Sequence, residues 1–284
     1  MIEVKGLTYR YPGTEKTALR DVSFTVSRGE IFGFLGPSGV GKSTLQKVMI
    51  GILKDYAGSV KVEGQELRET GAEYLEKIGV AFETPYFYHK FTALENLRFF
   101  SSLYRNKTLS PVDLLKQVGL SDAVHQRVSS FSKGMKTRLN VCRAFLHDPE
   151  LVFLDEPTSG LDPVSTEAVK KLILEKKAEG KTILLTTHHM AIAEELCDRV
   201  ALIVDGKIAL IDAPRVMKLK YGRKMVRVEY RDGDRLLARE FPLSGLAQND
   251  AFLRLLSHDG LETIHTQETT LERIFIAVTG RKLA

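Results

Sequence analysis

A glycine-rich segment near the N-terminus constrains the fold of this chain more than any other feature. It runs Gly36-Pro37-Ser38-Gly39-Val40-Gly41-Lys42-Ser43-Thr44 and fits the pattern G-x-x-x-x-G-K-[ST]. An apolar run, residues 31–35, precedes it, and a helix-forming run, residues 44–50, follows it. A strand, a glycine loop and a helix in this order hold a phosphate group, because the loop N–H groups and the helix N-terminus point at the same place. The segment therefore predicts a phosphate site on an α/β fold, in preference to a glycine-rich structural turn.

Side chains at the end of this loop and in a later segment add chemistry. Lys42 is placed to reach the β- and γ-phosphates of a nucleotide, and the Ser43 hydroxyl is placed to ligate Mg²⁺. A second apolar run, residues 151–154, ends in Asp155 and Glu156. In a parallel sheet, carboxylates at that end of a strand lie beside the ligand. Asp155 is therefore expected to hold Mg²⁺ through water and Glu156 to act as the general base; the alternative is a strand that ends in a solvated acidic turn.

Two further segments, one histidine and one tyrosine indicate a family. Phe131-Ser132-Lys133-Gly134-Met135 resembles the signature of ABC-type ATPases, and residues 158–163 resemble their D-loop. His188 resembles the family's switch histidine, and Tyr11 resembles the aromatic residue that stacks on adenine. These motifs occur in the family's order, and the resemblance covers residues 2–212.

The resemblance implies which residues bind the nucleotide. Every residue of the phosphate loop would contact ATP, and Glu83 would contact both the nucleotide and Mg²⁺. Ser132 and Gly134 would donate to the γ-phosphate bound on the opposite subunit, and Asp162 of the D-loop would belong to the same nucleotide-binding set. His188 would contact the γ-phosphate and orient the attacking water.

The chain departs from the family pattern in two places. In the signature, Phe131, Lys133 and Met135 replace Leu, Gly and Gln. Glu83 stands where the family usually has Gln; it keeps an oxygen that can ligate Mg²⁺ but adds a charge beside a phosphate. Both departures, together with the C-terminal segment 270–280, resemble the exporter branch that works with ABC-2 type permeases.

Composition is consistent with a cytoplasmic subunit. With 284 residues, of which 43% are hydrophobic, the chain is long enough for one large domain and a small one. The N-terminus begins a strand rather than a signal peptide, and no apolar run is as long as a membrane span. Cys142 and Cys197 lack metal-ligand spacing and are expected as buried thiols. A transporter ATPase of this kind would work with a separate membrane chain, peripherally on the cytoplasmic face of the membrane.

The apolar runs predict an α/β fold in two parts. Residues 1–213 would form the ABC-type ATPase domain, a P-loop NTPase core with a RecA-like parallel sheet, a helical subdomain at about 84–147 and an antiparallel β layer from residues 2–8, 22–26 and 59–62. Residues 214–284 would form a small C-terminal α+β appendage, with strands at 225–230, 236–241 and 261–265 and helices at 250–256 and 271–278.

Two segments have more than one interpretation. Residues 215–227 are basic with no acid between the cations, which suits anionic lipid or an acidic loop of a partner, although a solvated linker is the favoured interpretation. Residues 86–91 are aromatic and are either an interface for the membrane subunit or ordinary core packing. The net charge of +5 is mild, and no groove-reading motif accompanies it.

These features predict the ATP-binding and ATP-hydrolysing subunit of an ABC transporter, which powers export of a substrate through a separate permease. ATP would close this chain with a second copy, or with a homologous subunit, head to tail, and hydrolysis would reopen the dimer. The alternative is a soluble ABC-type ATPase that acts on ribosomes or nucleic acid. Such proteins usually carry two ATPase sets, zinc insertions or long coiled coils, and this sequence has one set and neither insertion. No direct nucleic-acid partner is therefore expected.

Overall fold

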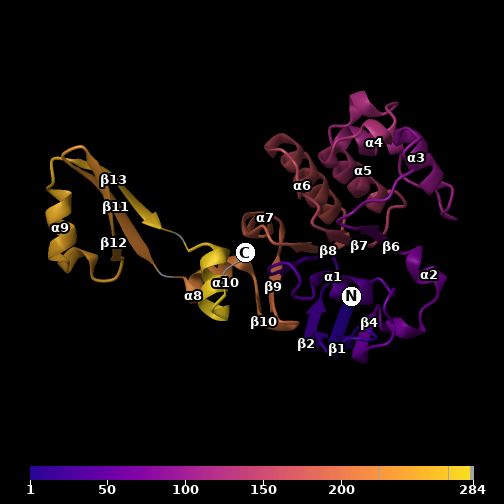
Figure 1. Ribbon diagram of the computed structural model, residues 1–284, viewed down its shortest axis with the longest axis horizontal. Helices are drawn as coiled ribbons and strands as arrows, with labels where there is room; N and C mark the ends of the chain where they lie inside the picture. The colour runs from indigo at the N-terminus through magenta and orange to yellow at the C-terminus, as the bar shows by residue number, and fades with distance from the viewer. Residues whose placement is uncertain (223, 268, 282–284) are drawn as a thin grey trace. The chain divides into compact units, whose positions relative to one another are not determined.

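The computed structural model describes residues 1–222, 224–267 and 269–281. The chain divides into two compact units, Met1–Ala213 and a second unit that begins at Pro214 (Figure 1). The first unit contains two sheets and the second contains one, and each unit has its own cluster of buried apolar side chains. The phosphate loop and every candidate site residue lie in the first unit.

A mostly parallel sheet forms the centre of the first unit. Its strands lie in the order β10 (Lys207–Asp212), β9 (Arg199–Val204), β3 (Ile31–Leu35), β8 (Thr182–Thr187), β7 (Leu151–Asp155) and β6 (Ile78–Ala81). Adjacent strands are parallel except for β9 and β10. The strands β3, β7 and β8 are buried at every residue, as expected of strands covered on both faces. Because these three strands are parallel, their carboxyl ends meet at one edge, which leads into the candidate site.

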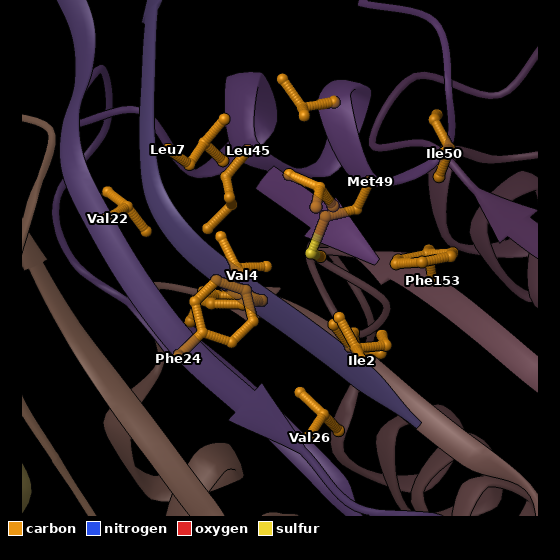
Figure 2. Close-up of a cluster of buried hydrophobic side chains, with 14 of the residues drawn as sticks. Ile2, Val4, Leu7, Val22, Phe24, Val26, Leu45, Met49, Ile50 and Phe153 are labelled. Carbon is orange, nitrogen blue, oxygen red and sulfur yellow. The ribbon is translucent and has the colours of Figure 1, made fainter. Parts of the chain in front are cut away.

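An antiparallel layer completes this unit. Its strands lie in the order β2 (Thr17–Val26), β1 (Ile2–Arg10), β4 (Ala57–Val62) and β5 (Gln65–Glu66). The first two strands are longer than expected from the sequence, because their pairing continues to Arg10 opposite Thr17. Their inward side chains share a core with the helix after the phosphate loop; Figure 2 shows Leu7, Leu45 and Met49 within it.

Helices complete the first unit. They are α1 (Lys42–Met49), α2 (Ala72–Leu75), α3 (Ala93–Ser101), α4 (Pro111–Gln117), α5 (Lys133–Phe145), α6 (Pro163–Ala178) and α7 (Met190–Leu196). Helix α3 begins at a capping box in which Thr92 and Glu95 each accept a hydrogen bond from the other's backbone N–H. Helices α3 to α5 form the expected helical subdomain. No helix in the described residues is long and apolar enough to cross a membrane.

The second unit is the expected α+β structure. Its antiparallel sheet has the order β12 (Arg235–Pro242), β11 (Met225–Asp232) and β13 (Leu261–Gln267), accompanied by helices α8 (Pro214–Tyr221), α9 (Asp250–Leu256) and α10 (Leu271–Thr279). Buried Val228 and Tyr230 of the central strand share a core with Phe252 and Leu255 of α9. The sheet is thus covered by α9.

The start of this unit corrects one expectation. The basic stretch was expected as a solvated linker, but residues 214–221 form helix α8. Its Met217 side chain is fully buried, and α8 packs against α10. The sequence did not reveal this helix, because its frequent charged residues are typical of a linker and few of its residues are buried.

Candidate nucleotide-binding site

The phosphate loop depends on glycine at two closely packed positions. A Cβ on Gly36 would lie 2.5 Å from the Ile203 carbonyl oxygen, and one on Gly41 would lie 2.7 Å from the Ala18 carbonyl oxygen. Gly41 also has a φ of +111°, which L-residues rarely adopt. As the N-cap of α1, Gly41 has no side chain to occupy the first N–H groups of the helix. These donors are therefore available to an anion.

Lys42 is folded back onto its own loop. Its Nζ donates to the carbonyl oxygens of Gly36 at 2.6 Å and Pro37 at 3.0 Å. The side chain is buried, and burial lowers its pKa against the opposing effect of Glu156, Asp155 and Glu83. A cation that two neutral carbonyls hold in a buried place is ready to pair with phosphate oxygens instead.

The two acids at the end of β7 are held by the end of β8. Burial raises the pKa of Asp155, although the Thr186 hydroxyl donates to it; Glu83 and Glu156 raise this pKa further. Glu156 is buried and has a φ of +50°, in the left-handed region. Its carboxylate accepts from the Thr187 hydroxyl at 3.1 Å. No role was expected for Thr186 and Thr187 from the sequence. The feature that could have identified them is a pair of hydroxyl side chains at the end of a predicted strand.

His188 lies on the same carboxylate. Its Nδ1 is 2.8 Å from Glu156 Oε1, and 44% of its side chain is exposed. The neighbouring His189 instead forms the N-cap position of α7, and the two rings are tilted 4.1 Å apart. Glu156 and His188 are therefore a contacting pair with one member open to solvent. The exposed member is His188, the residue expected to orient the attacking water.

The remaining candidates around the loop lie at its edges. Tyr11 and Thr44 share a hydrogen bond between their hydroxyl oxygens at 3.2 Å. Ser43, at the start of α1, is exposed. Glu83 follows β6, is exposed, and acts electrostatically on both Lys42 and Asp155. The fold thus brings together residues at or just after the ends of β1, β3, β6, β7 and β8.

The signature and D-loop residues form a separate group. Ser132 caps α5 by accepting from Met135 N at 3.2 Å. Asp162 caps α6 by accepting from the backbone and hydroxyl of Ser165, which lowers the pKa of this carboxyl. A Cβ on Gly134 would lie 3.3 Å from the Gly160 carbonyl oxygen, so the two segments touch. The hydrogen bonds of Ser132 and Asp162 stay at their own helices, and none reaches Lys42.

The residues present fit a magnesium ion. The carboxylates of Glu83, Asp155 and Glu156 act on one cation, Lys42, and burial, followed by repulsion from Glu83 and Glu156, raises the pKa of Asp155. Among the described residues, no group of three or more His, Cys, Asp or Glu side chains is placed to hold a metal ion. Mg²⁺ usually takes only one or two carboxylates, with substrate phosphates and water as its other ligands. The carboxylate oxygens at this place are ligands of the type that Mg²⁺ prefers, and phosphates and water would complete its coordination.

The chain is similar to known proteins over its whole length. A family model described as ABC transporter matches residues 19–159, and one described as fluoroquinolone efflux ABC transporter C-terminal domain matches residues 224–268. A fluoroquinolones export ATP-binding protein of Mycobacterium tuberculosis is 53% identical over 284 residues, which cover 100% of this chain and 94% of that protein. A bacitracin transport ATP-binding protein of Bacillus licheniformis is 33% identical, over 97% of this chain and 89% of that protein.

Solved structures share the fold of the first unit. An ATP-binding subunit of an ABC transporter superposes with a TM-score of 0.69 at 33% identity, over 78% of this chain and 93% of the other. A dimeric bacterial ABC transporter cassette gives a TM-score of 0.67 at 25% identity, over 75% and 98%. One similar cassette was solved as a dimer, and another is part of an ABC transporter complex. The chain therefore belongs to the ABC transporter family, as an ATP-binding, ATP-hydrolysing subunit of the exporter type.

Proposed function

We propose that this chain powers the export of a fluoroquinolone-like drug through a separate membrane permease. The chain itself binds to that permease at the cytoplasmic face of the membrane. The observation that carries the proposal is the 53% identity to a fluoroquinolones export ATP-binding protein over the whole chain. The second unit also matches a C-terminal domain described by fluoroquinolone efflux, so the likeness is not confined to the ATPase core. This favours transport over the alternative of a soluble ATPase acting on ribosomes or nucleic acid.

Two subunits complete each nucleotide site in this proposal. ATP lies between Lys42 of one copy and Ser132 and Gly134 of a second copy, which approaches head to tail. The separation of the signature and D-loop residues from Lys42 within one chain supports this arrangement, because their hydrogen bonds leave them at their own helices. ATP must bind the closed pair more tightly than the open pair, since otherwise ATP would not shift the equilibrium toward the closed pair.

The residues around Lys42 divide the chemistry between them. Lys42 exchanges its carbonyl partners for phosphate oxygens, and Tyr11 lies against the adenine. Ser43, Asp155 and Glu83 hold Mg²⁺, which neutralises charge on the phosphate oxygens when it is bound.

Hydrolysis itself requires a proton acceptor beside the γ-phosphate. Glu156 takes a proton from the attacking water while the bond between the γ-phosphorus and the β–γ bridging oxygen breaks, and ADP leaves with that oxygen. His188, in contact with Glu156, orients the water. Asp162 caps the start of α6, and its D-loop meets the nucleotide in the closed pair.

The aromatic segment after Glu83 supports the permease as partner. Tyr86 is 82% exposed, and Tyr88 and Phe91 are also exposed. Phe87 points inward and packs edge-on against Phe100. One residue of the segment thus belongs to the core, and the exposed rings form an apolar surface suited to an interface. We assign that surface to the membrane subunit.

Reconstitution of the chain with its permease tests the proposal. ATPase activity in proteoliposomes is expected to rise when a fluoroquinolone is added, and Lys42→Ala should abolish both the basal and the stimulated rate. Stimulation by an unrelated drug in place of a fluoroquinolone would contradict the proposed cargo. Copurification with ribosomes and with no membrane protein would favour the alternative class.

A further inference from the structure

The signature segment carries a cation without a partner in the described structure. Lys133 is the first residue of α5, its side chain is exposed, and it has no ion pair or side-chain hydrogen bond among the described residues. Its stem lies across the D-loop: a Cβ on Gly160 would be 3.4 Å from Lys133 Cδ and 3.8 Å from its Nζ. Because Gly160, with a φ of +72°, has no side chain, the Lys133 side chain lies directly against the D-loop at this residue.

The helix itself does not explain the position of Lys133. The N-terminus of an α-helix is partially positive, so a lysine there is disfavoured. The first turn of α5 contains no acidic residue that would offset this, and Lys136 adds a second positive charge. An anion from outside the chain would remove the unfavourable interaction.

The nucleotide site, in contrast, has an excess of negative charge. Among the described residues, the carboxylates of Glu83, Asp155 and Glu156 face the single cation Lys42. Glu83 contributes a charge where the family pattern has a neutral Gln. The phosphates of ATP add further negative charge at this place. Even with the Mg²⁺ assigned above, these carboxylates and the phosphates outweigh the positive charge of Lys42 and the ion, so the site gains from an additional cation.

We propose that Lys133 provides this cation across the dimer. In the ATP-bound pair, its ammonium group binds the nucleotide phosphates held by the second copy and offsets the charge of that copy's Glu83. The inference rests on the proposed head-to-tail dimer, in which Ser132 and Gly134, on either side of Lys133, meet the same phosphate. The two departures from the family pattern, Lys133 for Gly and Glu83 for Gln, then form a complementary pair.

A double-mutant cycle tests this pair. Four proteins, all carrying Glu156→Gln so that ATP is retained, are compared: the parent, Lys133→Gly, Glu83→Gln, and the two changes together. Analytical ultracentrifugation with ATP and Mg²⁺ gives each dimer dissociation constant. Because a charge-assisted contact is lost, Lys133→Gly should weaken the dimer about tenfold or more. The double variant should recover most of this loss, because both charges are removed together.

Two further variants separate charge from structure. Lys133→Arg should keep the dimer, because it keeps the charge, whereas Lys133→Ala should behave like Lys133→Gly. Lys116→Ala removes an exposed lysine from α4 and should leave dimerisation unchanged. Thermal unfolding without nucleotide should be the same for the parent and Lys133→Ala. A dimer unaffected by Lys133→Gly, or strictly additive effects in the cycle, would overturn the inference. A parent protein that does not dimerise with ATP would instead contradict the proposed function.

Discussion

At the scale of single residues, the proposed hydrolysis site combines a strained backbone with buried acidic side chains, and both destabilise the folded chain. Glu156 has a left-handed backbone, and its carboxylate is fixed by Thr187 and His188. Asp155 is buried beside it, and burial raises its pKa. Strained backbone and shifted pKa values concentrate at functional sites, because a ligand there compensates for them. The left-handed Glu156 and the buried Asp155 therefore support the proposal that a nucleotide binds beside them.

Replacing the proposed base should separate binding from hydrolysis. Glu156→Gln removes the proton acceptor but keeps a side chain that Thr187 and His188 can contact. ATP binding should remain, hydrolysis should slow by roughly 10²–10⁴-fold, and an ATP-bound dimer should accumulate. Steady-state ATPase assays and size-exclusion chromatography measure both effects, with Glu73→Gln on the exposed face of α2 as control. Near-normal turnover of Glu156→Gln would show that the base is another residue.

Replacing the neighbouring acid should stabilise the nucleotide-free protein. Because the pKa of Asp155 is raised in the folded chain, its ionised form is less stable there than in the unfolded chain. This destabilisation is present above the raised pKa and vanishes below the ordinary carboxyl pKa, where both states are protonated. Asp155→Asn should therefore raise the melting temperature at neutral pH and not at low pH. A lower melting temperature at neutral pH would contradict the stated cause.

At the scale of elements, α8 shows how a short charged segment gains its structure from packing. Eight residues are too few for a stable isolated helix in water. Met217 is fully buried, and α8 packs against α10, whose Ile274 and Phe275 are also fully buried. The helix therefore depends on its contact with α10 rather than on its own propensity.

Removing that contact should destabilise the second unit. Met217→Ala deletes a fully buried side chain, and such changes cost about 2–5 kcal/mol. Leu219→Ala is the matched control, since Leu219 lies on the same helix and is 65% exposed. Denaturant unfolding of the two variants should differ by most of that free energy. Equal stability would mean that the segment behaves as the linker expected from its charge.

At the scale of the whole molecule, the residues assigned to the nucleotide and the C-terminal α+β structure lie in different compact units. Every residue assigned to ATP lies in the unit Met1–Ala213. The second unit has its own core, and several large apolar side chains on its surface are exposed, among them Leu236, Leu253 and Ile264. These exposed side chains are available to a second copy, and a contact there would keep two ATPase cores close between cycles.

Truncation after Ala213 tests that role. ATP affinity should be unchanged, because the truncated residues hold none of the proposed ligands. Self-association without nucleotide should weaken, because the exposed apolar side chains of the second unit are lost. Sedimentation equilibrium of the full-length and truncated chains measures this difference. Identical monomer–dimer equilibria would exclude a dimerising role for the second unit.

The sequence by itself determined the phosphate loop, the acids at the end of β7, the order of the motifs and the α/β architecture. These follow from local physics: glycine where the backbone needs positive φ or close approach, and apolar runs of strand or helix length. Only the tertiary structure decided that Thr187 and His188 would hold Glu156, that Glu83 would act on Lys42, and that Lys133 would lie across Gly160. The reason is that these contacts join segments far apart in the chain, and strand order, which the local pattern does not encode, sets which strand ends meet.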